Sequence, residues 1–77
     1  MDSSFIKLKF GESVQQARTS LGLSQEELGS ACGLDRTYIS SVERGHRNIG
    51  LLNIVRIAGA LSLEPAALLK NLGECPP

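Results

Sequence analysis

The residues best suited to chemistry lie between positions 36 and 48, where arginines are interspersed with hydroxyl side chains. On a wheel of 100° per residue, Ile39 and Val42 share one side of a helix and polar residues fill the opposite arc. Solvated helix faces usually carry Glu and Lys, whereas short hydroxyls let a backbone approach a partner and arginines bind phosphates or guanine edges. The arc is therefore predicted to contact bases rather than only water. The candidate base-contacting residues are Arg36, Thr37, Tyr38, Ser40 and Ser41.

Donors that suit a phosphate backbone flank this arc. Arg47 and Asn48 follow it in an expected loop. Ser24 and Gln25 stand at the start of the preceding helix, where backbone N–H groups lack helical partners and attract anions. Phosphate contacts set register and orientation and leave sequence preference to the base contacts. The candidate backbone-contacting residues are Ser24, Gln25, Arg44, Arg47 and Asn48.

The segment from Ser24 to Gly45 is expected to position both sets as two short helices joined by a tight turn. Ser24 and Glu27 have the spacing of a capping box, which opens the first helix. Gly33 can end that helix in a left-handed conformation without steric cost. Asp35 is a favourable N-cap for the second helix, and Gly45 ends it.

Three further helices complete an all-α fold in a single domain, residues 1–77. The first is expected from about Leu8 to Leu21, the fourth from about Leu51 to Leu61, and the fifth from Glu64-Pro65 to about Asn71. Ile6, Leu8 and Phe10 alternate with lysines, which suggests that residues 1–7 form an extended N-terminal arm; an earlier start of the first helix is an equal alternative. Residues 73–77 are expected to form a loose tail. The first helix should bury the stripe Phe10, Val14, Ala17 and Leu21.

The fourth expected helix is apolar around most of its circumference, so it must be covered on two sides. One cover is the core of the domain. The other is predicted to be a second copy of the chain, with coverage by the fifth helix alone as the alternative. The residues expected at such a dimer interface are Leu52, Val55, Ile57, Leu61 and Leu68.

Composition narrows the possible functions. The chain has 77 residues, of which 42% are hydrophobic, and it lacks both a signal peptide and an apolar run of about 18 residues, so we expect a cytoplasmic protein without membrane contact. Eight Lys and Arg balance eight Asp and Glu. A neutral chain should bind DNA weakly in general and depend on specific contacts at a locally positive face.

The sequence offers little for catalysis. His46 is the single histidine, no carboxylates cluster, and no glycine-rich phosphate loop is present. Cys32 is expected on a buried helix face and Cys75 in the tail, without the spacing of metal ligands. We therefore expect neither an enzyme, a metal nor a cofactor.

The segment from position 24 to 45 resembles the helix-turn-helix of the Cro/C1 (Xre) repressor family, and the similarity spans about residues 8–72. This resemblance implies a five-helix, lambda-repressor-like fold that binds double-stranded DNA as a homodimer, and an ion pair between Arg18 and Glu43. A twofold dimer implies a near-palindromic operator with half-sites roughly 34 Å apart. Gly29 departs from the family, which usually has alanine there. The resemblance rests on Gln25, Leu28, Gly33, Ile39, Val42, Glu43 and Gly45.

A narrower similarity links the phrase from Leu34 to Ser40, with Glu43-Arg44 and Arg47-Asn48, to controller proteins of restriction–modification systems. That similarity implies control of the chain's own gene and of a restriction endonuclease gene, with RNA polymerase as a further candidate partner. A phage-type repressor and the antitoxin of a toxin–antitoxin pair are alternative regulators. A protein-interaction module that does not bind DNA is a rival of another class, which the arginine-and-hydroxyl arc disfavours.

Overall fold

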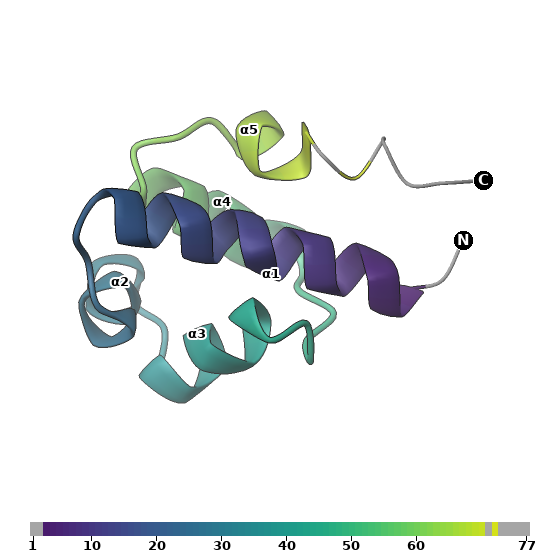
Figure 1. Cartoon of the computed structure of the whole chain (residues 1–77). Helices are drawn as coiled ribbons and strands as arrows, with labels where there is room; N and C mark the ends of the chain where they lie inside the picture. Colours follow the sequence, from purple (N-terminus) through teal and green to yellow (C-terminus); the bar gives the residue numbers. More distant parts are fainter. Residues whose placement is uncertain (1–2, 71, 73–77) are drawn as a thin grey trace.

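The computed structural model describes residues 3–70 and 72, and these form five α-helices and no strand (Figure 1). The all-α prediction is confirmed. The expected tail at 73–77, Cys75 and the predicted end of the fifth helix at Asn71 lie outside the described residues. Within those residues, no helix combines the length and the apolar character needed to cross a bilayer. The helices are α1 (Ser3–Ser20), α2 (Gln25–Cys32), α3 (Arg36–Glu43), α4 (Leu51–Ala60) and α5 (Pro65–Leu69).

Helix α1 runs through the middle of the molecule, with α2 and α3 on one side, α5 on the other and α4 behind it (Figure 1). Every helix contributes to one core, because each has an apolar stripe at helical spacing. This shared core fixes α2 and α3 relative to the rest of the chain. Its buried side chains are Phe10, Val14, Leu28, Ile39, Val42, Ile57, Ala58, Leu61 and Leu68.

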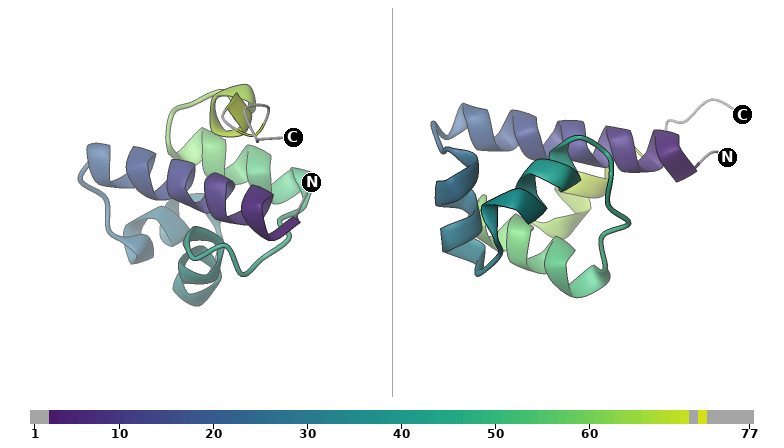
Figure 2. Two further views of the ribbon diagram at one scale, coloured as in Figure 1. Left: turned by 45° about the vertical axis from the view of Figure 1, so that its right-hand side comes forward. Right: turned by 90° about the horizontal axis from the view of Figure 1, so that it is seen from below.

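The N-terminal end of the chain differs from the predicted arm. Residues 3–7 are helical and continue directly into the rest of α1, whose N-terminal end extends beyond the other helices (Figure 2). The alternation of residues 5–10 was misleading, since Ile6 and Phe10 are also one helical turn apart and line the same cavity. The other end of α1 also differs, because Leu21 lies after the helix with 53% of its surface exposed. Gly22 turns the chain there with φ +72°.

Two glycines let the backbones of α1 and α3 approach closely. A Cβ on Gly11 would lie 2.3 Å from the carbonyl oxygen of Val42, and one on Gly45 would lie 2.8 Å from Leu8 Cα. Such distances are far inside van der Waals contact, so no larger residue fits this geometry. A third glycine, Gly29, serves the turn between α2 and α3, because its Cβ would lie 2.5 Å from the carbonyl oxygen of Leu34. Glycine, in place of the family's usual alanine, thus allows this close approach between α2 and the turn.

Candidate nucleic-acid interface

The turn between α2 and α3 is built as its sequence predicts. Ser24 Oγ accepts the N–H of Glu27 at 3.0 Å, and Glu27 Oε1 accepts the N–H of Ser24 at 2.8 Å, which completes the capping box. Hydrogen bonds to its carboxylate, first from the Ser24 backbone N–H and then from the Ser24 hydroxyl, lower the pKa of Glu27. Gly33 ends α2 in the left-handed region with φ +73°.

Asp35 caps α3 as expected. Its carboxylate accepts the backbone N–H of Thr37 at 3.1 Å and also the Thr37 hydroxyl. The bonds from the hydroxyl and then from the N–H lower the pKa of Asp35. Because the Thr37 hydroxyl serves the cap, its methyl group is the part left to meet a base.

A buried ion pair holds α3 against α1. Arg18 Nε donates to Glu43 Oε2 at 2.6 Å and Arg18 Nη2 donates to Glu43 Oε1 at 3.0 Å, which is the fork geometry of a strong bidentate pair. The bond to Glu43 raises the pKa of Arg18. Arg18 also donates to the carbonyl of Leu23, so the network fixes the loop before α2 as well. The ion pair that the family resemblance implied is present.

The outer face of α3 carries most of the predicted base-contacting residues. Arg36, Thr37 and Arg44 are exposed, and Ser40 is partly exposed. Ser41 is also partly exposed, but its hydroxyl donates to the Thr37 carbonyl at 2.7 Å and accepts from Arg47 Nε at 3.4 Å. The face is positive, because the charge of Glu43 is matched by Arg18 while Arg36 and Arg44 remain exposed.

Tyr38 is held from two sides, and one of its partners was not expected from the sequence. The guanidinium of Arg47 lies 5.1 Å from the centre of the Tyr38 ring, a cation–π contact. Asn53, in the first turn of α4, donates from Nδ2 to the Tyr38 hydroxyl at 3.1 Å. Asn53 therefore positions a predicted base-contacting residue. No local pattern marks this role, since the two side chains are 15 positions apart and meet only in the folded chain.

The predicted backbone-contacting residues divide into two groups. Arg44, Arg47, Asn48 and Ser24 are exposed, as a phosphate contact requires. Gln25 is different, because its Nε2 donates to Glu43 Oε1 at 3.0 Å and joins the buried ion pair. Its side chain thus braces α2 against α3, which leaves its backbone N–H, at the first turn of α2, as the donor available to a phosphate.

The residues predicted for a dimer interface are not all on one surface. Leu52 and Val55 are 64% and 47% exposed, and the neighbouring Leu51 is 75% exposed. Ile57, Leu61 and Leu68, in contrast, are enclosed by the chain's own core, with at most 2% exposed. Assigning these three to an interface was wrong, because they lie in the core that α4 forms with α2 and α5.

Residues for metal or thiol chemistry do not gather in the described part of the chain, where no three His, Cys, Asp or Glu side chains form a group that could hold an ion. Cys32 is half-buried, and its Sγ donates to the carbonyl of Leu28. Burial raises the pKa of this thiol, which keeps it protonated and unreactive.

A capped two-helix turn with an exposed basic second helix defines a helix-turn-helix DNA-binding domain of the Cro/C1 type. The helix-turn-helix family HTH_3 matches residues 14–68, and the chain belongs to this family of transcriptional regulators. Control protein C.BamHI of Bacillus amyloliquefaciens is 48% identical over 73 residues, which cover 91% of this chain and 90% of that protein. Control protein C.SmaI of Serratia marcescens is 43% identical over 68 residues, covering 88% and 81%.

Solved structures agree with this assignment. The restriction–modification controller protein C.AhdI of Aeromonas hydrophila superposes with a TM-score of 0.78 at 51% identity, covering 79% of this chain and 92% of that one. The P22 c2 repressor in complex with a synthetic operator superposes with a TM-score of 0.74 at 31% identity, over the same shares. The chain is thus similar to controllers of restriction–modification systems and to a phage repressor that binds an operator.

Proposed function

We propose that this chain is the controller of a restriction–modification system and binds a near-palindromic operator as a homodimer. The single observation that carries this proposal is the exposed basic face of α3, held in place by the buried Arg18–Glu43 pair. The relatives that are named as control proteins support the assignment to a restriction–modification system. As such a controller it acts in the cytoplasm and makes contact with RNA polymerase where it activates transcription.

In this proposal, α3 enters the major groove with its N-terminal end first. Arg36 has the exposure and the fork of donors needed for a bidentate bond to guanine. The Thr37 methyl and the Tyr38 ring face thymine methyls or sugar, and Ser40 and Ser41 extend the contact along the helix. Phosphate contacts set the position of the protein along the DNA. The residues proposed to make them are Arg44, Arg47, Asn48, Ser24 and, through its backbone N–H, Gln25.

The second copy of the chain covers the outer face of α4 that Leu51, Leu52 and Val55 leave exposed. Three adjacent aliphatic side chains lose hydrophobic stabilisation in water, at about 25 cal/mol for each Å² that stays exposed. Their pairing across a twofold axis places two α3 helices about one turn of DNA apart, roughly 34 Å. The operator is therefore a near-palindrome.

Selection of binding sites from random DNA, followed by titration of wild type and Arg36→Ala, tests the proposal. The selected site should be a near-palindrome, and Arg36→Ala should lose about 1–3 kcal/mol of preference for it over scrambled DNA. Lys70→Ala removes the same charge far from α3 and is the matched control. Equal discrimination by Arg36→Ala and wild type would exclude the assigned contact, and selection of no sequence would exclude the function.

Which genes the protein regulates must be tested in a separate experiment. Transcription reconstituted with RNA polymerase and the promoters beside this gene should change when the protein is added, at its own promoter and at that of an endonuclease gene. Response only at a phage lysogeny promoter or at a toxin promoter would assign one of the alternative circuits instead.

A further inference from the structure

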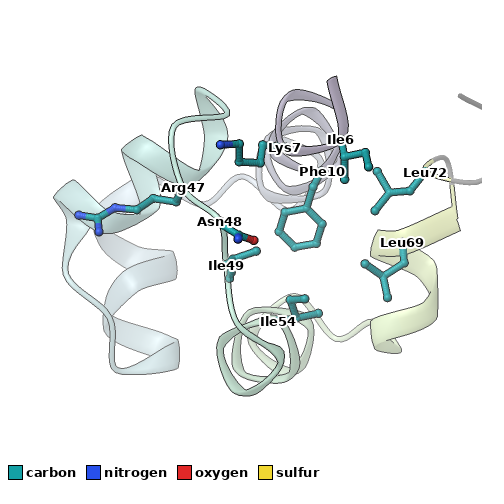
Figure 3. Close-up of a pocket in the computed structure, with 9 residues that line it drawn as sticks. All are labelled: Ile6, Lys7, Phe10, Arg47, Asn48, Ile49, Ile54, Leu69 and Leu72. Atoms are coloured by element: carbon teal, nitrogen blue, oxygen red, sulfur yellow. The ribbon is translucent and has the colours of Figure 1, made fainter. Parts of the chain in front are cut away.

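A cavity of about 110 Å³ opens between the first turns of α1, the loop after α3, α4 and the end of α5 (Figure 3). It lies beside the DNA-binding face and uses none of the predicted base-contacting residues. Its apolar walls are Ile6, Phe10, Ile49, Ile54, Leu69 and Leu72.

The size and the walls of the cavity suit a few carbon atoms. An enclosed cavity of about 150 Å³ lined by Leu, Ile and Phe accepts a benzene molecule and excludes water. The present cavity is somewhat smaller and is open on one side, since Leu69 at its edge is exposed. A short aliphatic chain therefore fits, with one end free to carry a polar group into water.

The polar side chains at the cavity determine which charged group the free end of such a ligand could carry. Lys7 and Asn48 belong to the lining, and in Figure 3 both lie on the loop side of Phe10, with the Asn48 amide turned toward the ring and the Lys7 side chain extending toward the loop. Arg47 points away, toward α3. Lys9, two residues further along α1, pairs with Glu12 at 3.6 Å, whereas Lys7 forms no ion pair with any of the described residues. An ammonium and an amide beside an apolar cavity match a carboxylate.

We propose that this cavity binds a small aliphatic carboxylate, its chain against Phe10 and Leu69 and its carboxylate at Lys7 and Asn48. The ligand would also meet the loop that connects α3 to α4, because Ile49 and Asn48 form one wall. That loop carries Arg47, which contacts the Tyr38 ring. Occupancy would therefore change operator affinity, a consequence that rests on the proposed function, and operator binding would change ligand affinity by the same factor.

Methyl NMR of the full chain titrated with pentanoate tests the site. We expect saturable shifts at Ile6, Ile49 and Ile54 with a Kd on the order of 1 mM, typical of a ligand with so few atoms. 1-Pentanol, which keeps the carbon chain and lacks the charge, should bind about fivefold more weakly. Equal binding of the two, or shifts centred on Leu51 and Leu52 instead, would overturn the proposal.

Two pairs of variants separate the cavity from general effects. Lys7→Gln should weaken pentanoate binding about fivefold, while Lys9→Gln should leave it unchanged. Leu69→Phe should fill the cavity and abolish the shifts, while Leu63→Phe, at a similarly exposed leucine outside the lining, should not. Binding seen only after removal of residues 73–77 would also overturn the proposal, since the intact chain would then not bind the ligand.

Operator titration with and without saturating pentanoate tests the coupling separately. A change in operator affinity that disappears in Leu69→Phe would link the cavity to the loop. Saturable ligand binding without any such change would contradict the coupling and leave the binding site established. Because the NMR titration contains no DNA, failure of the proposed function would not affect it.

Discussion

The crossing of α1 and α3 and the outer face of α4 are opposite kinds of surface. At the crossing, Gly11 allows the two backbones to approach closely, and Arg18 and Glu43 neutralise each other within the chain. On α4, Leu51, Leu52 and Val55 face outward, and nothing lies within 4 Å of a Cβ added to Gly59. The first surface orients α3, whereas the second is the proposed contact with a second copy of the chain. Substitutions at the two surfaces should therefore affect different measurements.

The largest effect is expected at the ion pair of the crossing. Arg18→Ala leaves the carboxylate of Glu43 buried without its positively charged partner, which should reduce the free energy of unfolding by about 3–5 kcal/mol. Urea denaturation measures this loss. The double variant Arg18→Met with Glu43→Leu removes both charges and should recover much of the stability. A loss below about 0.5 kcal/mol in Arg18→Ala would mean that the pair behaves as a solvated one.

The outer face of α4 should respond through association instead. Leu52→Glu places a charge on each side of the proposed twofold axis and should weaken the dimer by about 3 kcal/mol, from two leucines at about 1.5 kcal/mol each. Sedimentation equilibrium should then show monomers with unchanged helicity by circular dichroism. Leu63→Glu, at another exposed leucine, is the control. A persistent dimer in Leu52→Glu would mean that α4 does not form the interface.

Replacing glycine by alanine should change the free energy of unfolding in opposite directions at Gly11 and at Gly59. Gly11→Ala forces α1 away from the carbonyl of Val42 and should cost about 1–3 kcal/mol or more. Gly59→Ala meets no neighbour within the chain and should stabilise the monomer by about 0.5–1 kcal/mol, because alanine is the better helix former. Thermal unfolding of both variants at low protein concentration compares them. Equal signs would contradict the contrast between the two surfaces.

A smaller effect is expected at the cap of α2, which belongs to neither surface. Ser24→Ala should cost about 1 kcal/mol by removing the capping box. The folded pKa of Glu27 is lowered, so its contribution is present above the unfolded pKa and is lost as pH falls through the folded pKa. The stability of Ser24→Ala should consequently fall less steeply in acid than that of wild type. If the stability of Ser24→Ala and of wild type fell equally steeply with decreasing pH, the cap would not have this role.

Local features of the fold could be predicted from the sequence because they depend on neighbouring residues. Ser24, Gly33 and Asp35 act within a few positions of themselves, and their roles are confirmed. The prediction of which α4 residues face outward was partly wrong, for a physical reason. Periodicity shows that Leu52 and Ile57 are both apolar, but only packing decides that Ile57 faces the core and Leu52 faces out.

Contacts between residues distant in the sequence were also predicted only in part. The pair between Arg18 and Glu43, 25 positions apart, was accessible through the family resemblance and not through spacing. The bond from Asn53 to Tyr38 and that from Gln25 to Glu43 were accessible by neither route, because they join residues that are distant in the sequence and meet only in the folded chain. The DNA-contacting roles themselves stay predictions that the variants above can test.

The two contacts that hold Tyr38 have a further consequence for recognition. A free tyrosine on a helix surface samples several rotamers, and ordering it on a partner reduces its conformational entropy at a cost of about 0.5–1.5 kcal/mol. With Arg47 over its ring and Asn53 on its hydroxyl, Tyr38 has already lost that freedom when the chain folds. In the proposed DNA complex its side chain would therefore be preorganised, which would reduce the entropy lost on binding.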